Sequence, residues 1–114
     1  MSLGSDFERR VMAKLKEHGW YVMRAAGSRG VADLVAMRQR DPVRLGPEVL
    51  LVQCKRGFQC GPKEWNALVS AAEQVCAVPV LAAKVKRGVI GFWRMTGRKT
   101  GRKGVKAPIE ELVL

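Results

Sequence analysis

Two segments of this chain decide its fold, VADLVAMR at residues 31–38 and EVLLVQCK at residues 48–55. Both segments are rich in valine and leucine, which favour strands. The residues between them, 39–47, include an Asp-Pro and a Gly-Pro pair, and such pairs favour turns. We therefore predict two neighbouring strands that form a hairpin.

One register of this hairpin brings polar side chains together. If Arg38 faces Glu48, then Asp33 faces Gln53. Lys55 is the next residue on the same face, because side chains alternate between the two faces of a strand. Asp33 lies in an otherwise apolar strand, where an unpaired buried carboxylate is unfavourable. We therefore expect Asp33 to face solvent or to be held there for a chemical purpose.

A carboxylate, an amide and an ammonium in this arrangement suit the hydrolysis of phosphodiesters. That reaction needs a hard cation, usually Mg²⁺, to polarise the phosphate and lower the pKa of the attacking water. Asp33 would be the anionic metal ligand and Gln53 a neutral oxygen ligand. Lys55 would orient or deprotonate the water and offset charge in the transition state. The spacing fits equally well with a simple Asp–Lys ion pair on a polar sheet face.

The rest of the chain predicts helices and further strands around this hairpin. Apolar side chains at four-residue spacing indicate a helix over residues 5–18, and Gly61-Pro62 begins a second helix. The other predicted strands are residues 20–24, 79–84 and 89–95, and residues 109–114 form a short helix or strand. We predict one domain over residues 1–114, of the α/β class with a mixed α+β sheet and the order αβββαββ.

The charge of the chain points to a polyanionic partner. Its 21 Lys and Arg residues outnumber its 10 Asp and Glu residues, and the net charge is +11. For a domain this small, nucleic acid is the commonest partner of such a surface. Residues 96–108 are basic and glycine-rich, so we expect a flexible loop or arm. Lys99, Arg102 and Lys103 are its candidate phosphate contacts.

The cysteines and the hydropathy exclude several other classes of protein. The 3 cysteines form no CxxC pair and the chain has 1 histidine, so neither disulfides nor a zinc site is predicted. Cys54 points away from Gln53 and Lys55, and we expect it to pack in the core. Since no apolar run has the length of a signal core or membrane span, we expect a cytoplasmic protein without a membrane partner.

Three further residues are candidates for the same site. Glu8 borders the apolar stripe of the first helix and leans toward the core; the alternative is a first-turn glutamate favoured by the helix dipole. Arg24 shares a strand face with Trp20 and Val22, and Ser28 lies in the glycine loop just before Asp33. Together Arg24 and Ser28 could bind a phosphate near the metal. Alternatively, Arg24 only extends its charge to solvent and Ser28 stabilises a turn.

These motifs resemble those of archaeal-type Holliday junction resolvases, which belong to the PD-(D/E)xK nuclease superfamily. The resemblance covers nearly all of residues 5–95, and it rests on four stretches, Phe7-Glu8-Arg9, residues 22–28, residues 32–36 and Val52-Gln53-Cys54-Lys55. It implies a restriction-endonuclease-like core. It also implies an Mg²⁺-dependent endonuclease of four-way DNA junctions, with Mn²⁺ as a possible substitute, that acts as a homodimer on branched or duplex DNA.

The resemblance assigns a role to each matching residue. The helix glutamate of the family corresponds to Glu8, its phosphate-side arginine to Arg24, its loop serine to Ser28, its central metal ligand to Asp33 and its catalytic lysine to Lys55. We add Arg29, which follows Ser28, to the phosphate contacts.

Gln53 departs from the family pattern, which usually has Glu at this position. The expected metal ligands are therefore Asp33, Gln53 and Glu8, with one negative charge fewer than usual, which weakens metal binding. Two other functions remain open. One is a PD-(D/E)xK repair or restriction nuclease with another substrate, and the other is a non-catalytic basic module that binds nucleic acid.

Overall fold

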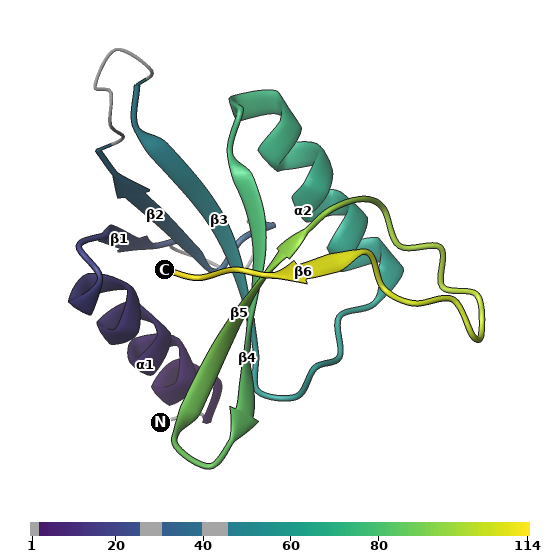
Figure 1. The fold of residues 1–114 in the computed structure, drawn as a ribbon, viewed down its shortest axis with the longest axis horizontal. Helices are drawn as coiled ribbons and strands as arrows, with labels where there is room; N and C mark the ends of the chain where they lie inside the picture. Colours follow the sequence, from purple (N-terminus) through teal and green to yellow (C-terminus); the bar gives the residue numbers. More distant parts are fainter. Residues whose placement is uncertain (1–2, 26–30, 40–45) are drawn as a thin grey trace.

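The computed structural model describes residues 3–25, 31–39 and 46–114 of the chain. Its elements follow in the order α1 (Leu3–Glu17), β1 (Tyr21–Arg24), β2 (Leu34–Arg38), β3 (Glu48–Lys55), α2 (Pro62–Val75), β4 (Val78–Lys86), β5 (Val89–Met95) and β6 (Ile109–Glu111). The strands form one sheet in which every strand lies beside its neighbour in sequence, β1-β2-β3-β4-β5-β6 (Figure 1).

A parallel strand pair decides where α2 lies. β3 and β4 are parallel, whereas the other neighbouring pairs of this sheet are antiparallel. A parallel connection has to cross over the sheet, and α2 makes this crossover. The first turn of α2 therefore follows the carboxyl end of β3 after the short segment 56–61.

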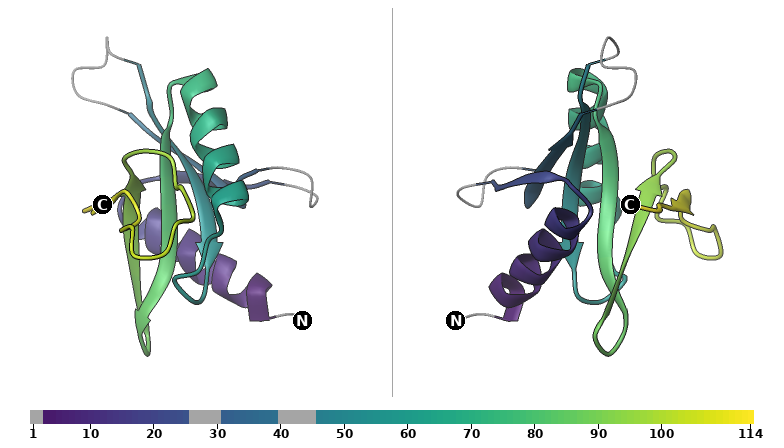
Figure 2. Two further views of the ribbon diagram at one scale, coloured as in Figure 1. Left: turned by 90° about the vertical axis from the view of Figure 1, so that its right-hand side faces the viewer. Right: turned by 60° about the vertical axis from the view of Figure 1, so that its left-hand side comes forward.

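The two helices cover opposite faces of the sheet (Figure 2). α1 packs through Phe7, Val11 and Leu15 against the face that carries the even-numbered residues of β2, β3 and β4. α2 packs through a second cluster that includes Trp65 and Leu81. Trp65 is only 1% exposed and lies in the core. Two apolar layers thus fix the sheet between the helices.

The predicted hairpin register is confirmed. Arg38 pairs with Glu48, and the pairing continues to Leu34 with Val52. The predicted strand over residues 31–38 is wrong at its start, because β2 begins only at Leu34. The C-terminal segment, for which helix and strand were both open, forms β6 against β5. The mixed sheet with flanking helices is confirmed, and β6 adds a last strand to the predicted order.

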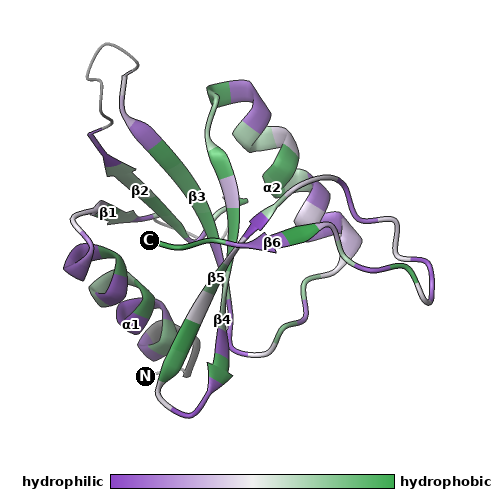
Figure 3. Ribbon diagram, viewed as in Figure 1, coloured by the Kyte–Doolittle hydropathy of each residue, from purple (hydrophilic) through white to green (hydrophobic). Residues whose placement is uncertain are grey.

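Hydropathy follows these layers. Apolar residues gather in the central strands and on the inner sides of the helices, whereas the loop at residues 96–108 is mostly polar (Figure 3). This loop turns at Gly101 and Gly104, whose φ angles of 78° and 81° favour glycine. Neither described helix is long and apolar enough to cross a membrane.

Candidate active site

Asp33 is held between two strands at the start of β2. Its carbonyl oxygen accepts a hydrogen bond from Ala25 N at 2.9 Å, and its own N–H donates to Val52 O at 2.9 Å. Its carboxylate Oδ2 accepts the N–H of Cys54 at 2.8 Å. Because this side chain takes the N–H of Cys54, the regular pairing of β2 with β3 ends at Leu34. Asp33 therefore lies just before the strand, not inside it as predicted.

Gln53 and Lys55 point to the face that α2 covers. Leu51, two residues earlier on the same face of β3, packs against the apolar cluster of α2. Lys55 Nζ lies 2.7 Å from Glu64 Oε2, and Gln53 Nε2 donates to the same oxygen at 3.4 Å. Glu64 thus joins the two polar residues of β3 that were predicted to act beside Asp33.

Glu64 also stabilises the charged form of Lys55. Its hydrogen bond to the ammonium raises the pKa of Lys55; the negative charges of Glu64 and Asp33 add to this rise, and burial opposes it. Lys55 is therefore a cation at neutral pH. A protonated lysine can stabilise negative charge on a phosphate, but it cannot accept a proton from water. Of the two predicted roles for Lys55, this environment favours charge stabilisation.

Glu8 and Arg24 form a separate pair on the α1 side of the sheet. Arg24 Nη2 lies 3.5 Å from Glu8 Oε1, and their side chains are 45% and 23% exposed. The structure thus brings together two of the residues that were named as candidates for the same site. Because Arg24 engages the carboxylate of Glu8, the role of Glu8 as a metal ligand stays a prediction.

Cys54 lies between Gln53 and Lys55 in β3, and its side chain points to the α1 side of the sheet. Burial raises the pKa of its thiol, and the negative charges of Asp33 and Glu8 raise it further. Both carboxylates therefore lie close enough to affect this thiol, although the sheet places Glu8 and Gln53 on opposite faces. Cys54 packs against the α1 core, as predicted.

The geometry around Asp33 fits a hydrated metal ion better than an enclosed one. In the described ranges, no three His, Cys, Asp or Glu side chains are placed to hold one ion. Mg²⁺ needs fewer protein ligands, since it keeps several waters and takes one or two carboxylates. Asp33 is only half-buried, and its Oδ1 accepts no hydrogen bond from a described residue. Asp33 Oδ1 and the amide oxygen of Gln53 are thus suitable oxygen ligands for such an ion.

The basic loop at residues 96–108 is attached to α2 at its start. The backbone N–H of Lys99 donates to Asn66 Oδ1 at 2.8 Å, and Asn66 Nδ2 donates to Lys99 O at 3.0 Å. Lys99 Nζ donates to Cys60 O at 2.7 Å and lies 5.1 Å from the centre of the Trp65 ring. The ammonium of Lys99 therefore has partners inside the protein and is less available for phosphate than predicted.

The other predicted phosphate contacts differ in position. Arg102 and Lys103 are exposed at the tip of the loop, and neither side chain has an ion pair with a described residue. Ser28 and Arg29 lie outside the described residues. The structure thus leaves Arg102 and Lys103 as the accessible cations of the predicted set in this loop.

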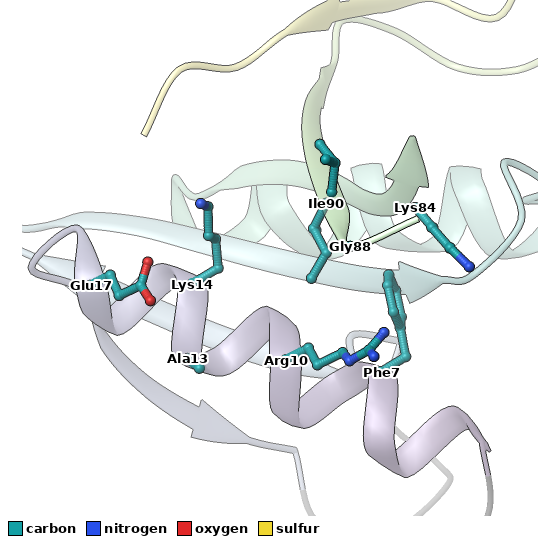
Figure 4. Close-up of a pocket in the computed structure, with 9 residues that line it drawn as sticks. Phe7, Arg10, Ala13, Lys14, Glu17, Lys84, Gly88 and Ile90 are labelled. Atoms are coloured by element: carbon teal, nitrogen blue, oxygen red, sulfur yellow. The ribbon is translucent and has the colours of Figure 1, made fainter. Parts of the chain in front are cut away.

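A groove of about 440 Å³ lies away from these residues, between α1 and the turn that joins β4 to β5 (Figure 4). Its lining includes the basic residues Arg10, Lys14 and Lys84 beside Phe7 and Ile90. It contains none of the predicted catalytic residues. Its cations can contact a polyanion, but the groove is not the catalytic site.

Glu64 is the site residue that the sequence reasoning missed. Two signals could have indicated it. Pro62 marks the first turn of α2, and a short connection after β3 brings this turn back beside the carboxyl end of that strand. The parallel pairing of β3 with β4, which makes the connection a crossover, was not predicted.

Comparison with known proteins agrees with this architecture. The sequence profile of the family described as archaeal Holliday junction resolvase (Hjc) matches residues 1–113. The crossover junction endodeoxyribonuclease Hjc of Methanocaldococcus jannaschii is 36% identical in an alignment of 85 residues, which covers 71% of this chain and 58% of that relative. The chain thus matches little more than half the length of this curated relative.

A solved structure shares the fold. It is that of Hjc from Archaeoglobus fulgidus, a Holliday junction resolvase from an archaeal hyperthermophile. The two structures superpose with a TM-score of 0.65 at 24% sequence identity, over 85% of this chain and 80% of the other. Since the family profile spans nearly the whole sequence, this chain belongs to the archaeal Holliday junction resolvase (Hjc) family.

Proposed function

We propose that this protein is an endonuclease that cleaves four-way DNA junctions by metal-assisted hydrolysis, with Mg²⁺ as its ion and Mn²⁺ as a substitute. One observation carries the proposal. The carboxylate of Asp33 is fixed on the backbone N–H of Cys54, beside the strand segment that presents Gln53 and Lys55. Membership of the resolvase family and the net charge of +11 support the choice of substrate.

Each residue has a defined part in the proposed reaction. A bound divalent ion would polarise the phosphate and lower the pKa of water. Asp33 and the amide oxygen of Gln53 would hold this ion. Lys55, whose ammonium pairs with Glu64, would stabilise the charge that develops on the phosphate. Arg24 would contact a flanking phosphate, with Glu8 fixing its guanidinium.

The DNA would contact cations around this site. Arg102 and Lys103 at the loop tip are proposed phosphate contacts, together with Ser28 and Arg29, which precede Asp33 in the sequence. Arg10 and Lys84 of the groove beside α1 would extend the positive surface on the other side. Contacts of this kind recognise the shape and charge of DNA and carry little information about base sequence.

We further propose that the protein acts as a homodimer. Two nicks in strands of like polarity require two symmetry-related sites. A suitable surface is the apolar face of β1 and β2, where Tyr21 pairs with Met37 and Met23 with Val35. Tyr21 is 66% and Met23 41% exposed, because α2 packs mainly against β3 and β4.

The dimer proposal is tested by sedimentation of the wild-type protein and of Met23→Lys. The wild type should sediment as a dimer, and the variant should form monomers because a charge is placed in an apolar contact. A matched control is Val85→Lys, an exposed valine near the end of β4. If Met23→Lys stays dimeric, this face is not the interface, and a monomeric wild type would contradict the homodimer itself.

One cleavage assay tests the proposed function. Labelled four-way junction, plain duplex and single strands are incubated with the protein and Mg²⁺, Mn²⁺ or a chelator. We expect paired symmetric nicks in the junction, little cutting of the duplex, and no product with the chelator.

The same assay distinguishes the other functions. Cleavage of duplex as fast as junction would favour a repair or restriction-type nuclease. Binding of junction without cleavage in either ion would favour a non-catalytic nucleic-acid-binding module. Location in the cytoplasm stays a prediction from the sequence.

A further inference from the structure

We propose that Glu64 is a positioning residue of the metal site, which supplies from α2 the negative charge that Gln53 lacks on β3. This inference rests on the proposed function, because it concerns the same site. It goes beyond that function by adding a residue that the family motif does not contain, in a chain that departs from this motif at position 53.

The contacts of Glu64 carry the argument. A single carboxylate oxygen, Oε2, lies 2.7 Å from Lys55 Nζ and 3.4 Å from Gln53 Nε2. Gln53 has one amide group that donates and one oxygen that accepts. Since Glu64 holds the donor end, the oxygen of Gln53 is free to act toward the ion that Asp33 attracts. Glu64 thereby orients a proposed ligand without being one.

The charges around Gln53 support the same role for Glu64. A glutamate at position 53 would bring a negative charge to the end of β3, and Gln53 brings none. Glu64 restores one negative charge beside Gln53 and Lys55, from the first turn of the neighbouring helix. It does not complete a three-carboxylate cage, since the described ranges contain no such group. Its effect on the ion is therefore exerted through Gln53 and through the field of its charge.

The fold explains why a helix residue can take this place. β3 ends at Lys55 and α2 begins at Pro62, so the connection spans residues 56–61. Buried Trp65 and Leu68 then hold the first turns of α2 against the sheet. Glu64, which precedes Trp65, is kept beside β3 by this packing. Its side chain remains 52% exposed, so a change there removes charge without removing core contacts.

The test measures Mn²⁺ affinity directly, by electron paramagnetic resonance of free Mn²⁺, in the full-length protein without DNA. Glu64→Gln keeps the size of the side chain and removes its charge. We expect it to weaken Mn²⁺ binding about tenfold, as is usual when a partner of a metal ligand is lost. Glu73→Gln is the matched control, because Glu73 lies on the same helix, is 65% exposed and pairs with Arg98 at 3.3 Å. Its affinity should equal that of the wild type.

A charge exchange separates this role from general stabilisation of the helix. In the double variant Gln53→Glu with Glu64→Gln, the negative charge moves to β3, and most of the lost affinity should return. An affinity of Glu64→Gln equal to that of the wild type would overturn the inference. So would a loss of affinity that Gln53→Glu does not repair.

Asp33→Asn distinguishes failure of the inference from failure of the proposed function. If Asp33→Asn loses Mn²⁺ binding while Glu64→Gln retains it, only the role of Glu64 is overturned. If Asp33→Asn binds Mn²⁺ as tightly as the wild type, the proposed metal site itself is wrong, and the inference is overturned with it.

Discussion

The charged residues near Asp33 are connected differently on the two sides of the sheet. On the α1 side, Glu8 and Arg24 form a single ion pair at 3.5 Å. On the α2 side, Glu64 lies 2.7 Å from Lys55 and also accepts a hydrogen bond from Gln53. Glu8 and Arg24 thus form a pair, whereas Glu64, Lys55 and Gln53 are three connected polar groups.

This difference indicates where the proposed chemistry is concentrated. An exposed ion pair contributes little free energy, because water screens its charges. A connected group fixes the orientation of each member, which a reacting site needs. We therefore expect substitutions on the α2 side to affect cleavage more than those on the α1 side.

Among substitutions on the two sides of the sheet, Lys55→Met on the α2 side should have the largest effect. Loss of the ammonium removes the cation proposed to stabilise charge in the transition state, and cleavage should fall by about 1,000-fold. Junction affinity should change little, because many other cations contact the backbone. Single-turnover cleavage and a binding titration measure the two quantities. A fall of less than tenfold in cleavage would argue against a catalytic Lys55.

Gln53→Glu, also on the α2 side, should strengthen metal binding. The added carboxylate provides the missing anionic ligand, and the Mg²⁺ concentration for half-maximal cleavage should fall by about tenfold. The check is a Mg²⁺ titration of the cleavage rate. An unchanged titration would mean that Gln53 does not contact the ion, and would remove part of the contrast between the two sides.

On the α1 side, Glu8→Gln should have a smaller effect. The pair with Arg24 is worth up to about 1 kcal/mol, which corresponds to at most about a fivefold change. We expect this change in cleavage rate, with the wild-type Mg²⁺ requirement. A large rise in the Mg²⁺ requirement would show that Glu8 is a metal ligand, and the two sides would then contribute equally.

The smallest effect on DNA binding should follow Lys99→Met. Its ammonium is bonded to Cys60 O and lies over Trp65, so the change should lower the free energy of unfolding by about 1 kcal/mol. Junction affinity should stay near the wild-type value.

A matched double variant, Arg102→Ala with Lys103→Ala, completes this comparison. It should weaken junction binding. Affinity should also fall less steeply with salt, so that the negative slope of log affinity against log salt decreases in magnitude by up to about 2. If Lys99→Met changes the slope as much as the double variant, Lys99 contacts phosphate despite its internal partners.

Much of the fold could be predicted from the sequence, because it depends on local patterns. Apolar spacing placed both helices, and the pairing of Arg38 with Glu48 gave the correct hairpin register. The start of β2 was missed, because no apolar pattern reveals that the side chain of Asp33 takes the N–H of Cys54.

The site was predictable only where its residues lie on neighbouring strands. Alternation along β3 put Gln53 and Lys55 on one face, as found. Glu64 was missed because its position depends on the parallel crossover of α2, which is a long-range feature. The internal bonds of Lys99 were missed for the same reason, since Asn66 and Cys60 are distant in sequence.

The most direct test of the account is the effect of Asp33→Asn on cleavage and on binding, measured with the same four-way junction. The substitution keeps the size of the side chain but removes its charge. We expect cleavage in Mg²⁺ to fall by about 1,000-fold or more, while junction affinity stays within about threefold of the wild type. Cleavage at the wild-type rate, or an equal loss of cleavage and affinity, would contradict it.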